Sequence, residues 1–370
     1  MRAAVLREFG KVEIEEVPDP VCGPRDVIID VRCVQPSVTE CMLIDGDDVA
    51  LHDSLAERLR TGPVQFGGHE FAGVIAEAGA DVPGLVPGLV PGRRVTAVET
   101  VGCRACLPCR RERPDACMAP SIIGFTRPGA FAERIAVPAG AVVPLPDEVS
   151  FSAGAAVQPL AGAVHAQAAL DVRPGETVLI LGGGVMGLLA AAVARHGNAG
   201  LVALSTRSPR KRQLAREFGA DVVLGDATQV AATARELTAG IGFDVVIETA
   251  GGSPTAGLAG TATMEVAVGV VRRGGRIAVV SVLPARAELP TGRMRDKALT
   301  LIHPRSGAGY YAATTSVFEH SLALTARGTV DLERLITHRL SGLESLPEAL
   351  TITRDKPASG AINPAQVNLP

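Results

Sequence analysis

Two different patterns of apolar and polar residues divide the chain. Up to about residue 150, short β-rich runs with Gly, Pro and Asp turns between them predict strands. These runs lie at 27–31, 74–77, 95–98 and 132–137, and residues 1–17 have the pattern of a strand pair. We therefore expect a β-rich unit in this part of the chain.

From about residue 160 the pattern changes to a short apolar strand followed by a longer helix, repeated along the chain. Alternation of this kind predicts a parallel sheet with helices on both faces. After Arg305 we expect a tail that is too short to fold alone and rejoins the first unit. The predicted strand and helix pairs are 177–181 with 186–196, 201–204 with 210–218, 222–224 with 230–238 and 245–248 with 263–271, followed by a strand at 276–281, a helix at 314–326 and a strand near 335–340.

Composition changes this picture little. The 370 residues suffice for two domains, and 47% hydrophobic with 20% charged residues are usual globular proportions, which excludes disordered and fibrous classes. A net charge of -3 without a basic stripe provides no electrostatic affinity for nucleic acid, so we expect no such partner. Because the N-terminus lacks an apolar signal core and no apolar run is long enough for a membrane span, we expect a cytoplasmic protein without membrane association.

A glycine-rich turn directly follows the strand predicted at 177–181 and precedes an apolar helix. It reads GGGVMG at 182–187, which is the G-x-G-x-x-G pattern. Gly182 permits the tight turn, Gly184 lets the backbone approach a pyrophosphate, and Gly187 lets helix and strand pack closely. The diphosphate would lie at the positive N-terminus of the helix. The turn therefore predicts a dinucleotide-binding domain.

The end of the second predicted strand indicates which dinucleotide is bound. An acidic residue about 20 positions after the turn would accept both ribose hydroxyls of NAD, but Thr206 stands there, followed by Arg207. Arg210, Lys211 and Arg212 come next, and basic side chains suit a 2′-phosphate. We therefore predict NADPH rather than NADH. The alternative is a basic helix start that only faces solvent.

Four of the seven cysteines crowd into a polar, proline-containing segment at 101–117. Their spacing, C-x2-C-x2-C-x7-C, can wrap four thiolates around one tetrahedral zinc. Since sulfur would fill every position, this zinc would be structural, and such ligation suits a reducing compartment better than a disulfide framework. Free or disulfide-linked thiols are the alternative. The four residues are Cys103, Cys106, Cys109 and Cys117.

Together, four segments resemble the zinc-containing medium-chain dehydrogenase/reductase family, whose members are alcohol dehydrogenase-like. They are GHEFAGVI (68–75), the four-cysteine segment, the GGGVMG turn and DLERLITHRL (331–340). The resemblance covers nearly the whole chain. It implies an α/β protein with a GroES-like β-rich catalytic domain at 1–158, completed by 305–370, and a Rossmann domain at 159–304. It also implies an active site in the cleft, a small-molecule substrate and a homodimer or homotetramer.

The resemblance also places six residues at the family's catalytic positions. Ser37 stands where the family has a zinc-ligating cysteine, and Gln158 stands where many members have a glutamate. The other positions are the hydroxyl of a proton relay, the acid behind the zinc ligands, and the histidine and glutamate of GHE. In chain order, the candidate catalytic residues are Ser37, Thr39, Glu40, His69, Glu70 and Gln158.

One thiolate and one carboxylate of the family pattern are thus replaced by neutral oxygen donors, which ligate a dication weakly. The sequence therefore leaves open whether His69 and Glu70 bind a catalytic zinc. The alternative is that the GHE segment has only a structural role, as a packed turn. Cys33 and Cys41, four residues on either side of Ser37, could supply a thiolate, although packing is their commoner role.

The two possibilities lead to different chemistry. With zinc, the metal would polarise a carbonyl and Thr39 would pass on the proton, as in alcohol and ketone interconversion. Without zinc, the substrate should already be electrophilic, and hydrogen bonds from the remaining polar side chains would assist.

We therefore predict an NADPH-dependent oxidoreductase that transfers hydride between the nicotinamide and a small or medium organic substrate of alcohol/ketone type. A zinc-free reductase of an activated C=C or C=N bond in a biosynthetic pathway is an alternative. A non-catalytic dinucleotide-binding protein and a lyase or epimerase stay open. The predicted cofactor-binding residues, which include family positions at the ends of two later strands, are Gly182, Gly184, Val185, Met186, Gly187, Ser205, Thr206, Arg207, Arg210, Lys211, Thr249, Ala250, Ser281 and Val282.

Overall fold

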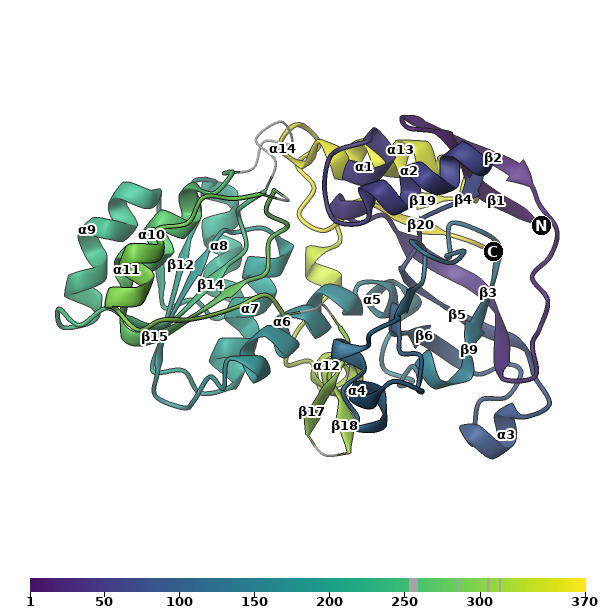
Figure 1. Cartoon of the computed structure of the whole chain (residues 1–370), viewed down its shortest axis with the longest axis horizontal. Coiled ribbons are helices and arrows are strands. Elements are labelled where there is room, and N and C mark those ends of the chain that lie inside the picture. The colour runs from purple at the N-terminus through teal and green to yellow at the C-terminus, as the bar shows by residue number, and fades with distance from the viewer. Residues whose placement is uncertain (253–258, 285, 305–306, 313) are drawn as a thin grey trace. The chain divides into compact units, whose positions relative to one another are not determined.

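The computed structural model describes residues 1–252, 259–284, 286–304, 307–312 and 314–370. The chain forms two compact units, one made of Met1–Gln158 with Gly307–Pro370 and the other of Pro159–Ser306. Figure 1 shows the course of the chain through both. In the described part of the chain, no helix is both long enough and apolar enough to cross a membrane.

The larger unit is built on a seven-stranded sheet with the order β10-β6-β5-β3-β20-β19, in which β9 also pairs with β3. Strand β20, near the end of the chain, pairs antiparallel with β3 and parallel with β19, so the tail completes this sheet. The strands are β3 (Asp26–Gln35), β5 (Glu70–Ala78), β6 (Arg94–Ala97), β9 (Arg134–Pro138), β10 (Val142–Pro144), β19 (Arg339–Ser341) and β20 (Gln366–Asn368).

Smaller elements surround this sheet. Strand β1 (Arg2–Glu8) pairs antiparallel with β2 (Lys11–Glu16), which confirms the predicted strand pair at the N-terminus. The other short strands are β4 (Val64–Gln65), β7 (Thr100–Val101), β8 (Ser121–Ile122), β17 (Tyr310–Ala312) and β18 (Thr315–Ser316). The helices are α1 (Val38–Asp45), α2 (His52–Thr61), α3 (Val82–Leu85), α4 (Leu107–Arg110), α5 (Phe151–Ala155), α12 (Val317–Ala326), α13 (Leu346–Arg354) and α14 (Lys356–Ser359), and α6 (Val157–Ala169) begins in this unit.

The second unit is a six-stranded, fully parallel sheet with the order β13-β12-β11-β14-β15-β16. The order reverses between β11 and β14, and ligands of such sheets bind beyond the carboxyl ends of the strands at this point. The strands are β11 (Thr177–Leu181), β12 (Leu201–Ser205), β13 (Val222–Leu224), β14 (Phe243–Glu248), β15 (Val271–Val279) and β16 (Thr300–Ile302).

Helices cover both faces of the parallel sheet. Leu179 and Leu181 pack in one core with residues of α9 (Ala227–Leu237) and α10 (Ala262–Val270). Val178 and Ile180 are equally buried, and alternation along a strand directs them to the opposite face. The remaining helices of the unit are α7 (Val185–His196), α8 (Pro209–Glu217) and α11 (Thr291–Asp296). The α/β fold class, with its β-rich and parallel-sheet domains, is therefore confirmed.

Some element boundaries differ from the sequence-based expectation. Strand β15 begins at Val271 instead of Arg276, because its polar RRGG segment belongs to the strand and hid the apolar pattern. Helix α12 begins at Val317 instead of residue 314, because Ser316 is its N-cap and forms a capping box with Glu319. The strand expected near 335–340 is a 3-10 turn at Glu333–Leu335 followed by β19.

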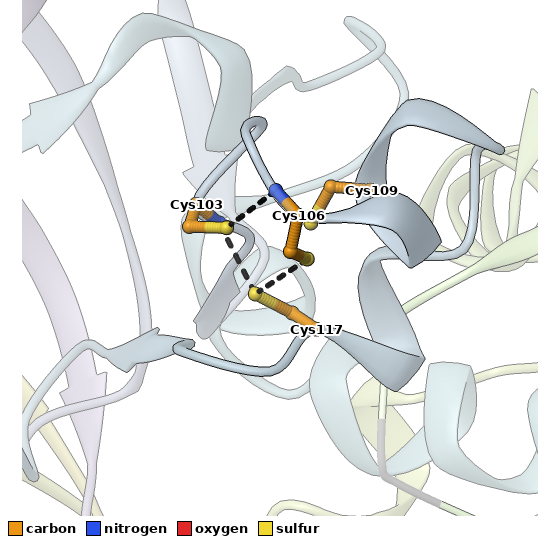
Figure 2. A group of neighbouring side chains, drawn as sticks. All are labelled: Cys103, Cys106, Cys109 and Cys117. Carbon is orange, nitrogen blue, oxygen red and sulfur yellow. Dashed lines mark hydrogen bonds between the residues drawn. The ribbon is translucent and has the colours of Figure 1, made fainter.

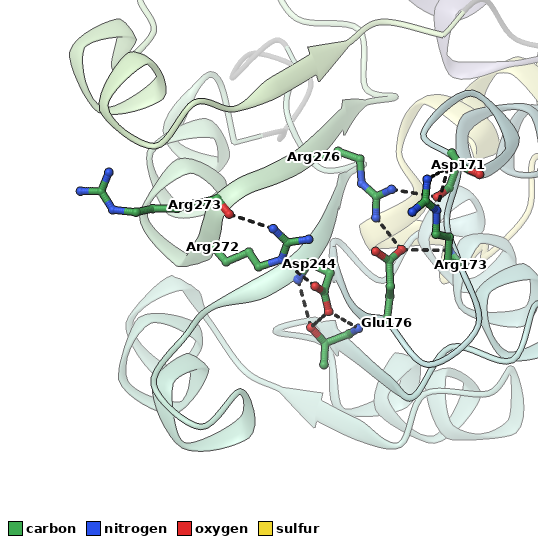
Figure 3. A network of polar contacts seen from close by, with 8 residues as sticks. Asp171, Arg173, Glu176, Asp244, Arg272, Arg273 and Arg276 are labelled. Carbon is green, nitrogen blue, oxygen red and sulfur yellow. Dashed lines mark hydrogen bonds and ion pairs between the residues drawn. The ribbon is translucent and has the colours of Figure 1, made fainter.

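A polar network ties together the amino ends of the central parallel strands (Figure 3). The Asp244 carboxylate accepts hydrogen bonds from the Thr177 backbone N–H and hydroxyl, both at 2.8 Å, and from Arg272 Nε at 2.6 Å. Arg276 pairs with Glu176 at 2.5 Å. Hydrogen bonds thus connect β11, β14 and β15 at their amino ends and hold the strands in register. The carboxyl ends of these strands carry the site described below.

Candidate functional site

The glycine turn connects β11 to α7 and leaves a helix N-terminus open. Gly184 is the N-cap of α7 and has no side chain to accept from the first N–H groups, which are left for an anion. A Cβ on Gly184 would meet no atom within 4 Å. By contrast, Gly182 has a φ of +116°, and a Cβ on Gly187 would lie 1.8 Å from the Gly182 carbonyl oxygen. These three positions therefore fit a diphosphate, and two of them require glycine.

Thr206 follows β12 directly and lies against this turn. It is buried, and a Cβ on Gly183 would come within 2.6 Å of the Thr206 Cβ. The predicted adenosine-side residues after it are positively charged: Arg207 and Arg210 are exposed, and Lys211 is half-buried. Burial, followed by the charge of Arg210, lowers the pKa of Lys211. This end of the strand thus offers cationic groups and no carboxylate at the ribose position.

Arg212 has a different role from its basic neighbours. Its Nε donates to the Thr206 carbonyl oxygen at 3.4 Å, so this side chain turns back onto the loop. The Ser208 N–H also approaches the Thr206 hydroxyl at 3.4 Å. These contacts hold the loop between β12 and α8.

The carboxyl end of β14 is held by a buried glutamate, to whose side chain the sequence-based interpretation gave no role. Glu248 Oε1 accepts from the Ala250 and Gly251 N–H groups, each at 2.7 Å, and its Oε2 accepts from the Ser281 hydroxyl. Thr249 Oγ1 donates to the Leu181 carbonyl at 2.9 Å and joins β14 to β11. Of the predicted cofactor residues here, Ser281 thus directs its hydroxyl to Glu248. An acid that ends a buried apolar strand was the available signal.

Figure 2 shows four cysteines that lie together, Cys103, Cys106, Cys109 and Cys117, and the segment that carries them, residues 101–117, is called the cysteine lobe below. One ligand atom from each lies within 4.8 Å of every other, and the Sγ atoms of Cys106 and Cys117 are 3.9 Å apart. Tetrahedral zinc with bonds of about 2.3 Å places its sulfurs about 3.8 Å apart. Backbone N–H groups donate to Cys103 Sγ at 3.3 Å and to Cys117 Sγ at 3.2 and 3.4 Å. The lobe therefore fits a four-thiolate zinc.

Charge in the lobe is consistent with metal ligation. Backbone N–H groups, that of Met118 first, lower the pKa of Cys106 to about 6. Burial opposes ionisation of Cys117, but backbone N–H groups outweigh it and lower its pKa. Burial, followed by the neighbouring thiols, raises the pKa of Cys109 to about 12. A dication would hold all four sulfurs as thiolates.

Ser37 and Glu40 begin α1 as a capping box. The Ser37 hydroxyl accepts from the Glu40 N–H at 3.0 Å, and the Ser37 N–H donates to Glu40 Oε2 at 2.7 Å. Thr39 lies half-buried in the first turn of the same helix. At the family's thiolate position, this chain therefore has a hydroxyl that is used to cap a helix.

The other oxygen of Glu40 holds His69. Glu40 Oε1 accepts from the Gly68 N–H at 2.7 Å and from His69 Nδ1 at 2.8 Å. Burial alone would lower the pKa of His69, but Glu40, Glu70 and Glu99 raise it to about 9. The imidazole is therefore charged near neutral pH. With Nδ1 bound to Glu40, its Nε2 lies 3.5 Å from Glu70 Oε1.

Glu70 connects the histidine to the tail of the chain. Gln35 Nε2 donates to Glu70 Oε2, and Gln35 Oε1 accepts from Asn363 Nδ2 at 2.7 Å and from Gln366 Nε2 at 2.9 Å. All these side chains are buried. Sequence reasoning missed the amides, since no motif marks them. Gln35 meets Glu70 because they are direct partners in the pairing of β3 with β5.

Glu99 is a further buried acid that the sequence did not reveal. Burial raises its pKa to about 7, although the charge of His69 and a hydrogen bond from Gln158 oppose this shift. Within the described residues, its Oε2 is buried and has no hydrogen-bond partner. Glu99 stands immediately before the cysteine lobe, where an acid at the end of the apolar run VTAV was the available signal.

These donors do not fit the family's thiolate-based catalytic zinc. The Ser37 hydroxyl caps α1, the Cys41 thiol donates to the Leu350 carbonyl oxygen, and Cys33 is fully buried in β3. Among the residues that the structure describes, the lobe cysteines form the group in which three or more potential ligand atoms lie within 4.8 Å of one another. The side chains around His69 can themselves hold and move a proton.

Two family models match the chain. Residues 23–147 match the family model of the alcohol dehydrogenase GroES-like domain, and residues 185–325 match that of the zinc-binding dehydrogenase. The chain is 31% identical over 345 residues to an L-threonine 3-dehydrogenase of Rhizobium etli (strain CIAT 652), with 92% of each protein covered. It is 31% identical over 344 residues to the Mesorhizobium japonicum protein of the same name, again with 92% of each covered.

Solved structures give the same picture. A candidate zinc-binding dehydrogenase from Sinorhizobium meliloti 1021 bound to NADP has a TM-score of 0.78 and 28% identity, covering 100% of this chain and 98% of that one. Galactitol-1-phosphate dehydrogenase from Escherichia coli has a TM-score of 0.80 and 27% identity, covering 100% and 99%.

Proposed function

The chain belongs to the zinc-containing medium-chain dehydrogenase/reductase family, and we propose that it is an NADP(H)-dependent oxidoreductase that interconverts an alcohol and a ketone. The alcohol-type chemistry is that of its relatives, whose names are those of threonine and galactitol-phosphate dehydrogenases. When bound, the nicotinamide would supply or accept the hydride. The predicted cytoplasmic location and homo-oligomer stay predictions.

The choice of NADP(H) rests on the end of β12. Thr206 occupies the position at which an acid would bind the ribose of NAD, and cationic Arg207, Arg210 and Lys211 follow it. Lys211 is half-buried close to Arg210, so two basic side chains lie together at this end of the strand. A structure with 28% identity to this chain contains NADP.

His69 is the residue to which we assign the proton. Glu40 fixes its Nδ1, so the proton on Nε2 is the one that can be given to a substrate. In reduction, as hydride reaches the carbonyl carbon, His69 would donate this proton to the oxygen and become neutral. In oxidation, it would take the proton from the hydroxyl. Glu40 is then a positioning residue, and the single observation that carries this mechanism is its hydrogen bond to His69.

We also propose that the four-cysteine lobe holds one structural zinc. The mutual distances of its sulfurs and the N–H groups directed at them support this assignment. Elemental analysis should then give one zinc per chain. Two zincs would show that a catalytic ion is also bound.

The test of the proposed function is a nucleotide comparison with a panel of alcohols and ketones. Because a hydrogen bond to a charged group contributes about 1.5–3 kcal/mol, kcat/KM should favour NADPH over NADH by about tenfold to a hundredfold. A preference for NADH would contradict the cofactor assignment. Tight NADPH binding without turnover of any substrate would instead favour a non-catalytic binding protein.

A second candidate function is the zinc-free reduction of an activated C=C or C=N bond. The observation in its favour is Ser37 at the thiolate position, since a site without a metal favours a substrate that is already electrophilic. Turnover of enones or imines without turnover of ketones would select this candidate.

A further inference from the structure

Helix α2 carries an arginine that has no counter-ion in the described part of the structure. Arg58 is half-buried, and its Nη1 donates to the carbonyl oxygen of Phe125. Burial lowers the pKa of Arg58, and no carboxylate of the described residues opposes this shift. Arg60, two residues later, is exposed and ion-paired with Glu57. The two arginines of one helix are therefore in opposite situations.

Arg58 belongs to the surroundings of His69. The ring of Phe125 lies 4.9 Å from the imidazole of His69, measured between centroids, and 5.7 Å from the ring of Phe66 in an edge-to-face contact. Phe66 and Phe125 are both buried. Phe125 thus makes both contacts: its carbonyl oxygen accepts from the Arg58 guanidinium, and its ring packs on His69, the proposed proton donor.

Without a counter-ion among the described residues, Arg58 is suited to bind an anion close to His69. Guanidinium carries five N–H donors, and the carbonyl of Phe125 takes one position, which leaves donors for a planar or tetrahedral anion. Removing a cation from water without a partner is unfavourable, so the binding of an anion there would be favoured. The anion would have to reach the same site as the hydroxyl or carbonyl that His69 serves.

We propose that Arg58 is a specificity-determining residue that binds an anionic group of the substrate, either a carboxylate or a phosphate. This inference rests on the proposed function, because it assumes that His69 marks the reacting end of the substrate. The substrate class is then a secondary alcohol, or its ketone, that carries an anionic group a few bonds away.

The test compares anionic compounds with their neutral counterparts on the NADP-loaded protein. 3-Hydroxybutyrate and 3-hydroxybutanamide test a carboxylate, whereas glycerol 3-phosphate and glycerol test a phosphate. Calorimetry gives the dissociation constants, and cofactor absorbance gives kcat/KM. The wild-type protein should favour the anion of at least one pair by about tenfold to a hundredfold, as expected for a charged hydrogen bond.

Variants assign this preference to one residue. Arg58→Gln should abolish it while the neutral compound binds as before, and Arg58→Lys should retain part of it because the charge remains. The matched control Arg60→Gln should leave it unchanged. Equal weakening of the anionic and neutral compounds would show a structural role and overturn the proposal, and so would a preference that survives in Arg58→Gln.

The outcomes also separate this inference from the proposed function. If the alcohols are oxidised with no difference between anionic and neutral members, the role of Arg58 is wrong and the oxidoreductase stands. If anions bind through Arg58 but neither the alcohols of the two pairs nor the alcohols and ketones of the panel above react, Arg58 is an anion-binding residue and the proposed reaction is wrong.

Discussion

The cysteine lobe and the cluster around His69 belong to the same unit but differ in the cation that faces their acidic groups. In the lobe, four sulfurs lie close together and backbone N–H groups donate to those of Cys103 and Cys117, an arrangement that fits a bound cation. Around His69, Glu40 pairs with the imidazole itself, whereas Glu99 Oε2 is buried without a hydrogen-bond partner among the described residues. The two regions thus treat charge in different ways: in the lobe four sulfurs are arranged as a zinc ion would need them, whereas around His69 a protein cation lies among the acids.

The largest expected effect comes from breaking the lobe. Cys106→Ser removes one of four anionic ligands, and because structural zinc contributes about 10–16 kcal/mol of binding free energy in small zinc domains, loss of the ion should destabilise the unit strongly. Zinc content should fall from one per chain toward zero, with a lower Tm. Cys22→Ser is the matched control, since Cys22 is a free cysteine outside the lobe. Unchanged zinc in Cys106→Ser would refute the assignment.

The next effect should be on catalysis alone. His69→Gln keeps a hydrogen-bonding side chain but cannot deliver a proton, and general acid–base catalysis contributes about 10²–10⁴-fold to rates. We expect kcat to fall within that range while NADPH affinity and zinc content stay the same. If zinc content fell together with the activity, His69 would be a metal ligand and the contrast between the two regions would disappear.

A gain of metal would sharpen the same contrast. Ser37→Cys restores the thiolate of the family pattern at the start of α1, next to Glu40 and in the same site as His69 and Glu70. Thiolate is a much stronger zinc ligand than a hydroxyl. Zinc content should rise from one toward two per chain in this variant and not in Ser37→Ala. If the wild-type protein already holds two, Ser37 does not prevent catalytic zinc binding.

A structural feature could be predicted from the sequence where the residues that form it are close together along the chain. The strand and helix alternation, the glycine turn and the spacing of the lobe cysteines are local, and local spacing fixes local geometry. Gln35, Glu99 and Asn363 have no such spacing to His69. They reach the cluster through strand pairing and through the return of the tail, which a single sequence does not reveal.

Charge at a buried site is equally hidden from the sequence. Thr206 could be identified as a missing acid because the family fingerprint counts residues from the turn. The pairing of Ser281 with Glu248, by contrast, follows from the adjacent carboxyl ends of β14 and β15. Such pairs are set by the parallel register, which apolar periodicity alone does not specify.

The smallest expected effect is the pH dependence of stability. It tests whether a protonated His69, instead of a metal ion, balances the charge of Glu40. His69 has a folded-state pKa of about 9, above its ordinary value of 6.5, so the folded protein binds the proton more tightly than the unfolded chain does. The stabilisation from this group is complete below about pH 6.5 and is lost as pH rises through about 9. Glu99, raised to about 7 by burial, also makes the folded state less stable as pH rises from about 4.5 to 7, and this contribution is complete before that of His69 is lost.

The difference between wild type and His69→Gln contains the contribution of the histidine, together with the change in Glu99, whose raised pKa the charge of His69 opposes. The free energy of unfolding, measured with urea, should exceed that of the variant by an amount on the order of a few kcal/mol at about pH 6.5, and this gap should shrink toward about pH 9.5. In the variant the Glu40 carboxylate keeps its N–H donors from Ser37 and Gly68 but loses its cation. A gap that stays constant with pH would mean that the imidazole is neutral in the folded protein, in which case Glu40 positions His69 without charging it and the proton would have to come from another group.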